Sequence, residues 1–317
     1  MNQTAGRGIY FLKNYGVKYV LVSAIDSIAF RYFKNLGHII MPVRAGMVKK
    51  YLKKTYQEVF DKYCRSQKMR GGVIPEEAPI WICWWQGIGD MPPIAKACLR
   101  SIETHKGNHP IRFIDKNNVG RYIDVPDSFI QKAERGHYTI ANFTDWLRTS
   151  LLYRYGGIWL DITTWINADI DDIIQDRTFF TIQHGLFHSW HVCRGKWMVG
   201  YFACAAGDAV MEFVSQMLYR YMEKEEYCMY YLLTDCVLSL GYDEIKAVRR
   251  EIDAVGKCCS GLFEMQQKMN LEYQPELFRM NGDNAVNKLS YKGKLRKHTQ
   301  NRKLTNYGYL IKTYAGD

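Results

Sequence analysis

A helix, a pair of glycines, a short apolar strand and an acid follow one another within residues 141–163, and this order constrains the fold more than any other feature. Four apolar side chains recur at every fourth position and predict one buried helical face: Phe143, Leu147, Leu151 and Tyr155. Asn142 or Thr144 can cap the start of this helix. Gly156-Gly157 can end it, because glycine adopts positive φ without strain.

The strand that follows the glycines predicts a binding site. Residues 158–160 (IWL) form a short apolar run, and Asp161 closes it. Ligands of open α/β sheets bind beyond the carboxyl ends of the strands. A buried carboxylate without a partner is costly, so we expect a metal ion or a cationic side chain beside Asp161.

Three motifs resemble those of the capsular-polysaccharide-synthesis glycosyltransferases and occur in the same order along the chain. That family is related to the glycosyltransferase family 32 group and uses a DxD motif. The family's Ser/Thr-Asp-x-x-Arg helix corresponds to residues 144–148 (TDWLR), and its Tyr-Gly-Gly-Ile-Trp-Leu-Asp segment corresponds to residues 155–161. Residues 80–87 (IWICWWQG), followed by Pro92-Pro93, resemble its opening strand and nucleotide loop. Residues 288–292 (KLSYK) resemble its closing basic segment. The resemblance covers roughly residues 75 to 310.

The resemblance implies an α/β fold of the GT-A type, with a mainly parallel Rossmann-like sheet flanked by helices. It implies a hexosyltransferase that moves a sugar from a nucleotide-diphosphate donor, with a UDP-sugar favoured, to a capsular or lipid-linked polysaccharide. Most of the related enzymes retain the configuration of the sugar, so retention is expected here. Two alternatives stay open: a sugar-phosphate transferase on a similar fold, and a non-catalytic scaffold at a membrane surface.

The predicted catalytic residues are Asp145, Arg148 and Asp161. A divalent cation can neutralise a diphosphate leaving group, and Mg²⁺ or Mn²⁺ prefers oxygen ligands. Asp161 is the first expected ligand, and Thr163 is expected to bind the ion directly or through water, because it would face the same side if the chain is extended there. A full DxD would place an acid at position 163, so Asp169, Asp171 and Asp172 are considered as substitutes, although a solvated loop is the preferred interpretation for them. Asp145 and Arg148 are three residues apart and can meet on one helical face, either at the donor or as a simple ion pair.

Aromatic and basic residues are expected to bind the donor. A tryptophan ring could stack on the nucleobase, although core packing is the alternative for each one. Lysine suits the leaving phosphates because its charge is compact and mobile. The predicted donor-binding residues, besides Asp145 and Arg148, are Trp81, Trp84, Trp85, Gln86, Gly87, Lys288 and Lys292.

Acceptor contacts are expected at Asp235 and His188. His184, His188 and His191 have helical spacing that could gather Zn²⁺, but the segment includes a glycine and a complete tetrahedral set is not recognised. A role for this loop at the acceptor is therefore preferred.

Positive charge is concentrated at the N-terminus. Residues 1–70 contain fourteen Lys or Arg and three Asp or Glu, whereas the remainder contains 29 of each. Residues 47–63 have apolar side chains at helical spacing, flanked by Lys49, Lys50, Lys53 and Lys54. Such a helix can rest on an anionic membrane or can pack on the catalytic core with its lysines in solvent. Nucleic acid is disfavoured, since the rest of the chain has no net charge and no binding motif.

The expected organisation is a basic amphipathic helical arm at residues 1–72 and a GT-A glycosyltransferase domain at residues 73–317. The nine cysteines are scattered and odd in number, which favours reduced thiols in the cytoplasm. Neither a convincing signal peptide nor a spanning segment is visible. The expected location is therefore the cytoplasm, in peripheral contact with the inner face of the cell membrane.

Along the second part of the chain, apolar runs alternate with helical patterns, which predicts a mainly parallel sheet. Strands are expected at 81–85, 110–114, 158–160 and 179–182. Helices are expected at 94–105, 141–155, 210–222 and 227–240. Residues 281–317 are polar and basic and are expected to return over the site.

Overall fold

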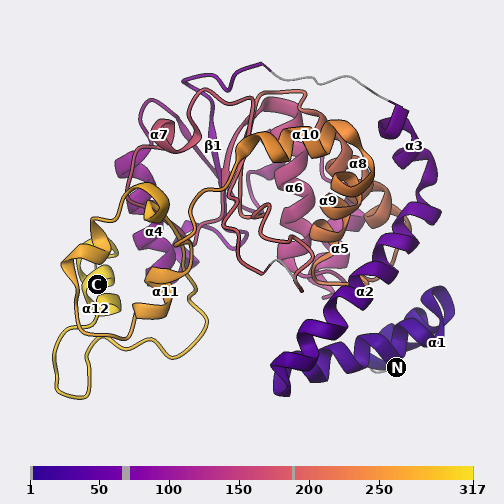
Figure 1. The fold of residues 1–317 in the computed structure, drawn as a ribbon, viewed down its shortest axis with the longest axis horizontal. Coiled ribbons are helices and arrows are strands. Elements are labelled where there is room, and N and C mark those ends of the chain that lie inside the picture. The colour runs from indigo at the N-terminus through magenta and orange to yellow at the C-terminus, as the bar shows by residue number, and fades with distance from the viewer. Residues whose placement is uncertain (1–2, 66–71, 188–189, 317) are drawn as a thin grey trace.

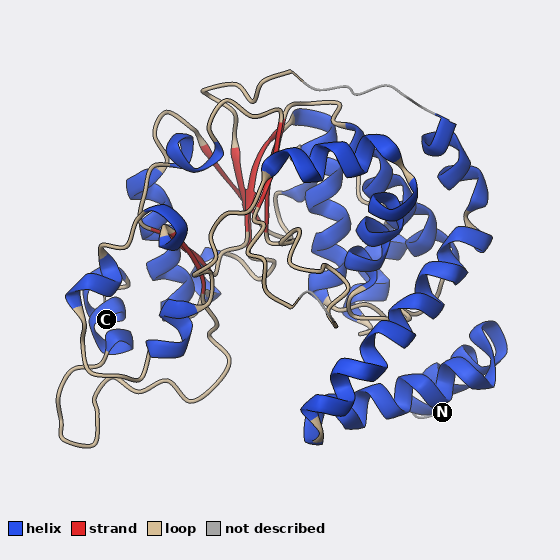
Figure 2. Ribbon diagram, viewed as in Figure 1, coloured by secondary structure: helices blue, strands red, loops and turns tan. Residues whose placement is uncertain are grey.

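A five-stranded sheet in the order β2-β1-β3-β6-β5 lies at the centre of the molecule, in a computed structural model that describes residues 3–65, 72–187 and 190–316 (Figure 1; Figure 2). β1 pairs in parallel with β2 and β3, whereas β6 runs antiparallel to β3 and to β5. Four strands therefore point in one direction, which confirms the predicted mixed α/β fold with a mainly parallel sheet. The strands are β1 (Ile80–Cys83), β2 (Ile111–Ile114), β3 (Gly157–Leu160), β5 (Phe179–Thr181) and β6 (Tyr201–Cys204).

Helices surround this sheet, and α6 packs on α8 (Figure 1). They are α4 (Pro93–His105), α5 (Asp127–Glu134), α6 (Ile140–Tyr155), α7 (Ile170–Ile174), α8 (Ala209–Lys224), α9 (Leu233–Glu244) and α10 (Lys246–Val255). The helices predicted at 94–105, 141–155 and 210–222 are confirmed. The one predicted at 227–240 begins only at Leu233, because Tyr227 and Cys228 are held by tertiary contacts to Tyr10 and to the carbonyl of His137.

The transition from α6 to β3 depends on its two glycines. Gly156 and Gly157 have φ values of 67° and 103°, as the sequence predicts. A Cβ at Gly157 would lie 2.3 Å from the Pro79 carbonyl oxygen, so no side chain fits there. The start of the helix corrects the prediction: Thr139 is the N-cap, and its side chain accepts from the Asn142 backbone N–H.

A smaller unit at the C-terminal end carries its own core around Trp165, with Cys98, Met265 and Leu310. It contains the two-stranded antiparallel sheet of β4 (Thr164–Ile166) and β7 (Val286–Lys288), together with α11 (Glu264–Lys268) and α12 (Asn306–Tyr314). Pairing of β7 with β4 brings the C-terminal segment back toward the end of β3. Short 3₁₀ helices are η1 (Ile88–Asp90), η2 (Val119–Arg121), η3 (Pro275–Phe278) and η4 (Gly282–Asn284).

The N-terminal segment is helical, as predicted, and forms α1 (Gln3–Tyr32), α2 (Lys34–Thr55) and α3 (Gln57–Arg65). The helix expected over 47–63 is interrupted at Tyr56. α2 packs against α9, and α3 packs against α8. Val48 and Leu52 are fully buried in the same core cluster as the strands of the main sheet. The division at residue 72 stays a prediction.

Candidate functional site

Asp161 lies directly beyond the carboxyl end of β3, at the edge where the parallel strands β1 and β2 also end. Its Oδ2 atom is 2.6 Å from the Lys288 ammonium. Its Oδ1 atom accepts from the Trp159 indole N–H at 3.1 Å and lies 3.2 Å from Arg148 Nη2. The sequence-based expectation of a cationic partner is therefore met twice.

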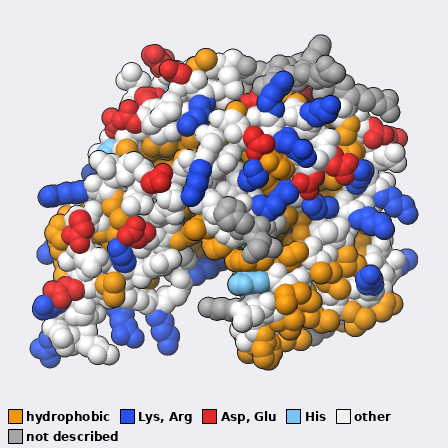
Figure 3. Space-filling model, viewed as in Figure 1, with side chains coloured by type: hydrophobic (Ala, Val, Ile, Leu, Met, Phe, Trp, Pro, Cys, Tyr) orange, Lys and Arg blue, Asp and Glu red, His pale blue; other side chains and the backbone are white. Residues whose placement is uncertain are grey.

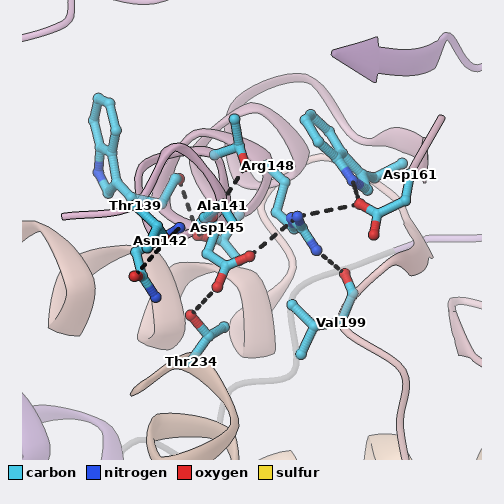
Figure 4. A network of polar contacts seen from close by, with 12 residues as sticks. Thr139, Ala141, Asn142, Asp145, Arg148, Asp161, Val199 and Thr234 are labelled. Carbon is cyan, nitrogen blue, oxygen red and sulfur yellow. Dashed lines mark hydrogen bonds and ion pairs between the residues drawn. The ribbon is translucent and has the colours of Figure 1, made fainter. Parts of the chain in front are cut away.

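Arg148 connects Asp161 to Asp145 (Figure 4). Its Nη2 atom is 3.0 Å from Asp145 Oδ1, and its Nη1 atom donates to the Val199 carbonyl. The guanidinium also lies over the Trp159 ring at 5.1 Å. The predicted pairing of Asp145 with Arg148 one turn apart on α6 is thus present, and it is part of a larger network rather than an isolated surface pair.

The surroundings shift the pKa values of the two carboxyl groups of this network in opposite directions. Burial would raise the pKa of Asp161, but the Lys288 ammonium and the Arg148 guanidinium hold it well below its usual range. Burial raises the pKa of Asp145 to about 6, against the opposing effects of Arg148 and of the Thr234 hydroxyl, which donates to Oδ2 at 2.7 Å. Asp161 is therefore firmly ionised, whereas Asp145 titrates near neutral pH.

A cavity of about 270 Å³ opens beside this network. Its walls come from α6, α9, the end of β3 and the loops before α9 and β6, and include Asp145, Arg148, Asp161, Phe187, Tyr231 and Asp235. Asp235 is buried in its wall and accepts from the Trp197 indole N–H at 2.9 Å. Burial raises the pKa of Asp235 to about 6, although the bond from Trp197 opposes the shift. The structure therefore places the predicted acceptor residue Asp235 in the same cavity as the predicted catalytic residues.

The predicted donor-stacking tryptophans separate into two groups. Trp81 and Trp85 are buried in the core, where Trp81 donates to the Gly156 carbonyl and Trp85 contacts Phe143. This is a correction, because neither ring is available to a nucleobase. Trp84 is half-buried, its ring centroid lies 5.6 Å from that of Tyr291, and its indole nitrogen is buried without a hydrogen-bond partner.

The loop after β1, which is predicted to bind the nucleotide, is open to solvent. Gln86 is exposed, and Gly87 adopts a φ of 101°. A Cβ at Gly87 would lie 3.8 Å from Asp115, which follows β2 at the same edge of the sheet. Both predicted residues therefore lie near the strand ends that the donor is expected to approach.

Thr163 lies in a turn that follows Asp161 and not in an extended segment. The Thr164 backbone N–H bonds to the Asp161 carbonyl at 2.8 Å, which closes a turn over positions 162 and 163. The chain is therefore not extended there, and the premise on which Thr163 was expected to face the same side as Asp161 does not hold. Asp169 and Asp171 pair with His105 and His109 instead of reaching the site.

Lys292 and His188 complete the set of predicted site residues. Lys292 is exposed, while Lys288 is the cation that reaches Asp161. His188 lies outside the described residues. Among the described residues, His184 lies in a loop and His191 in a bend, and neither belongs to a helix.

Several contacts of the site escaped the sequence analysis. Trp159 could have been found, because it precedes Asp161 by two residues and so shares a side of the strand. Thr234, Trp197 and the Val199 carbonyl come from elements far away in sequence, and no local pattern marks them.

The protein ligands available at this edge suit a divalent cation that binds together with a diphosphate. Among the described residues, no group of three or more His, Cys, Asp or Glu side chains is positioned to hold a metal ion. Mg²⁺, however, is commonly bound by one or two carboxylates together with substrate phosphates. Asp161 supplies one ionised carboxylate at the strand edge, and Lys288 is the competitor for its Oδ2 atom.

Two curated relatives align with part of the chain. "Probable glycosyltransferase FCK3" of Fusarium pseudograminearum (strain CS3096) is 27% identical over 118 residues, which cover 32% of this chain and 28% of the relative. "O-glycosyltransferase braB" of Annulohypoxylon truncatum is 24% identical over 113 residues, covering 33% and 27%. The alignments thus span little more than a quarter of either relative.

Among solved structures, the PaToxG glycosyltransferase aligns over 68% of this chain and 86% of its own, with 13% identity and a TM-score of 0.37. The family model described as capsular polysaccharide synthesis protein matches residues 30–308. That span includes the strands of the main sheet, the Asp145–Arg148–Asp161 network and Lys288. The chain therefore belongs to the capsular polysaccharide synthesis protein family.

Proposed function

We propose that this protein is a GT-A-type glycosyltransferase that moves a sugar from a nucleotide-diphosphate donor to a glycan acceptor. One observation carries the proposal: Lys288 and Arg148 both contact the ionised Asp161 at the carboxyl edge of the sheet, beside a cavity that contains Asp235. Family membership supports it, as do the names of two partial relatives that are themselves called glycosyltransferases.

The cations match the chemistry of the leaving group. Breaking the bond between the sugar and the diphosphate leaves negative charge on phosphate oxygens, and preorganised cations stabilise that charge. Lys288 offers a compact charge on a flexible stem, and Arg148 offers a planar fork that is already held in place by Asp145 and the Val199 carbonyl. Trp84 lies at the end of β1, on the same edge, where its ring can contact the nucleobase.

We propose that a Mn²⁺ or Mg²⁺ ion accompanies the donor, with Asp161 as its protein ligand. Such an ion would supply Lewis-acid neutralisation of the diphosphate. Asp161 suits this role because Lys288 and Arg148 keep it ionised.

The acceptor is proposed to bind in the cavity, where the Asp235 carboxylate would accept a hydrogen bond from its hydroxyl group. In a retaining transfer, the acceptor oxygen bonds to the anomeric carbon on the face from which the phosphate oxygen leaves. The acceptor proton passes to that phosphate oxygen, so no separate base is required. A UDP-sugar donor and a surface polysaccharide acceptor complete the proposal.

The test is a screen of the purified protein against a panel of nucleotide sugars with Mn²⁺, with free nucleotide diphosphate as the readout. Release from one or a few donors, lost in Asp161→Asn and kept in Asp171→Asn, is the expected result. Asp171 is a suitable control because it is an acid paired with His109 away from the site. NMR of the product would report whether the anomeric configuration is retained.

Two outcomes would replace this proposal. A product that carries the donor's phosphate would identify a sugar-phosphate transferase. Absence of turnover with every donor, in a protein that still binds nucleotide sugars, would favour a non-catalytic role.

A further inference from the structure

The described part of the chain exposes most of its large hydrophobic side chains on one hairpin. Eleven of the nineteen such side chains lie between residues 9 and 43, in α1 and the first half of α2. Figure 3 shows hydrophobic side chains gathered over the region that Figure 1 labels α1 and α2. We call this surface the hairpin face, and its members are Ile9, Leu12, Val17, Leu21, Ile25, Ile28, Tyr32, Phe33, Leu36, Ile39 and Val43. Contiguous exposure of this kind marks an interaction site.

The hairpin face has a regular helical pattern. Val17, Leu21, Ile25, Ile28 and Tyr32 recur at steps of four, four, three and four residues. At about 100° per residue, these positions fall within a stripe of about 80° on α1 after its kink at Gly16. On the same wheel Lys18 and Arg31 fall on the two flanks of the stripe, and both are exposed.

The hairpin face carries positive charge without exposed acid. Residues 3–46 contain a single acidic side chain, Asp26, which is buried and forms an ion pair with Arg44 at 2.9 Å. Arg7, Lys13, Lys18 and Arg31 are exposed. Two copies of this surface facing each other would bring cations together without a counter-charge, so self-association is disfavoured. An anionic lipid headgroup layer complements both the apolar stripe and its flanks.

The opposite side of the hairpin is fixed to the core. The buried Glu225 carboxylate accepts hydrogen bonds from the hydroxyl groups of four tyrosines of α1, α2 and the junction after α2: Tyr10, Tyr15, Tyr51 and Tyr56. Arg44 donates to the Met229 carbonyl at 3.0 Å. These contacts hold α1 and α2 in one orientation, with the hairpin face outward.

Aromatic contacts connect the hairpin face to the candidate site. The His38 ring stacks on Trp190 with centroids 4.2 Å apart, and Trp190 contacts Phe187 at 5.0 Å. Phe187 is part of the cavity wall and is partly exposed. His38 lies between Leu36 and Ile39 of the hairpin face in sequence. A continuous chain of ring contacts therefore leads from the hairpin face to the cavity wall.

We propose that the hairpin face docks onto the headgroup layer of an anionic bilayer, and that the cavity takes an amphiphilic, lipid-anchored acceptor from that layer. The second part rests on the proposed function, whereas the docking does not. Within the described residues, none of the helices combines the length and apolar character needed to cross a bilayer. The docking surface also differs from the lysine-flanked helix at 47–63 that the sequence suggested, since Val48 and Leu52 of that helix are buried.

Co-sedimentation of the full chain with phosphatidylcholine vesicles, with and without phosphatidylglycerol, tests the docking. The double variant Leu21→Glu/Ile28→Glu should weaken binding to anionic vesicles at least about tenfold. Val73→Glu/Leu271→Glu is the matched control, because it places the same charges at exposed apolar residues outside the hairpin and should bind as wild type. Lys18→Gln/Arg31→Gln should lose about thirtyfold on anionic vesicles, since each cation contributes about 1 kcal/mol there.

Donor hydrolysis in lipid-free solution separates docking from catalysis and should be unchanged in Leu21→Glu/Ile28→Glu. Transfer to a dodecyl glycoside embedded in anionic vesicles should fall in that variant, while transfer to the methyl glycoside in solution should not. Equal vesicle binding by wild type and the glutamate variant would overturn the docking. A lipid-free dimer that the same variant converts to a monomer would overturn it in favour of a self-interface. If no donor is hydrolysed, the proposed function fails while vesicle binding still tests the docking.

Discussion

The ammonium nitrogen of Lys288 lies 2.6 Å from Asp161 Oδ2, although 127 positions separate the two residues. Pairing of β7 with β4 creates this contact, because Lys288 is the last residue of β7 and Thr164 is its register partner. Together with Arg148, the lysine places two cations around one firmly ionised acid. A diphosphate that enters this edge can therefore gain a lysine without a change of fold.

The first prediction concerns the charge of Asp161. Asp161→Asn keeps the shape of the side chain but leaves Lys288 and Arg148 without their common counter-ion. Turnover should fall at least about a hundredfold, as is usual when charge organisation at a leaving group is lost. Initial rates of nucleotide diphosphate release measure the effect. Circular dichroism of the variant should match wild type, and a rate within a few-fold of wild type would contradict the role.

The second prediction concerns the divalent ion. If Asp161 holds a cation with the donor, excess chelator should abolish turnover, and added Mn²⁺ should restore it. Thr163→Asp is the companion variant. Because position 163 lies in a turn, the carboxylate that Thr163→Asp introduces should not lower the Mn²⁺ concentration that turnover requires. Titration of activity with Mn²⁺ measures this, and turnover unaffected by chelator would leave Lys288 as the neutralising group.

The sequence was informative wherever local chemistry decides structure. The glycine pair, the strand of residues 158–160 and the acid after it are local features, and each lies where it was expected. The pairing of Asp145 with Arg148 followed from helical spacing alone. The contact of Trp159 with Asp161 was not predicted but could have been, because residues two apart share a side of an extended chain.

Tertiary packing decided the rest. Whether Trp81 or Trp84 faces a ligand depends on what covers each side of β1, and alternation alone could not tell. The spacing of Val48 and Leu52 allowed either a membrane helix or a helix packed on the core, because burial against α9 leaves no mark in the spacing. The hairpin face was missed, since Asp26 interrupts its apolar run in sequence but points to the other side of α1.

The third prediction separates the shape of Arg148 from its charge. Arg148→Lys keeps a positive charge but cannot span Asp145, Asp161 and the Val199 carbonyl at once. Turnover should fall at least about tenfold, while the melting temperature falls by only a few degrees. Steady-state kinetics and thermal melts measure the two effects. Arg154→Lys is the control on the same helix, and an equal loss of turnover there would remove the special role of Arg148.

The fourth prediction is a pH dependence of stability that Asp145 causes. Burial raises its pKa to about 6 from 3.8, so the folded protein keeps this proton between these values while the unfolded chain has released it. The folded state binds more protons in this window, and the free energy of unfolding therefore falls as pH rises through it. A full shift of this size corresponds to about 3 kcal/mol.

Asp145→Asn has no titratable group at this position, so it should lose this fall in the free energy of unfolding with rising pH. Urea unfolding of wild type and variant across this range should show the variant gaining relative stability as pH rises, by up to about 3 kcal/mol. The variant also loses the contact between Asp145 and Arg148, which changes the free energy of unfolding by the same amount at every pH. The dependence of this free energy on pH therefore reports the titration of Asp145. Parallel pH profiles for the two proteins would show that Asp145 has an ordinary pKa.

The last prediction concerns Glu225, the carboxylate that four tyrosine hydroxyls share. Glu225→Ala leaves one buried and three partly buried hydroxyls without this acceptor, so the free energy of unfolding should fall by at least about 3 kcal/mol. Glu223→Ala is the matched control, because this neighbouring acid forms only an exposed pair with Arg220 and should cost about 0.5 kcal/mol or less. Urea unfolding measures the loss, and hydrogen exchange should show α1 and α2 opening faster than the sheet. Exchange in α1 that is unchanged by Glu225→Ala would mean that the hairpin is held by its apolar contacts alone.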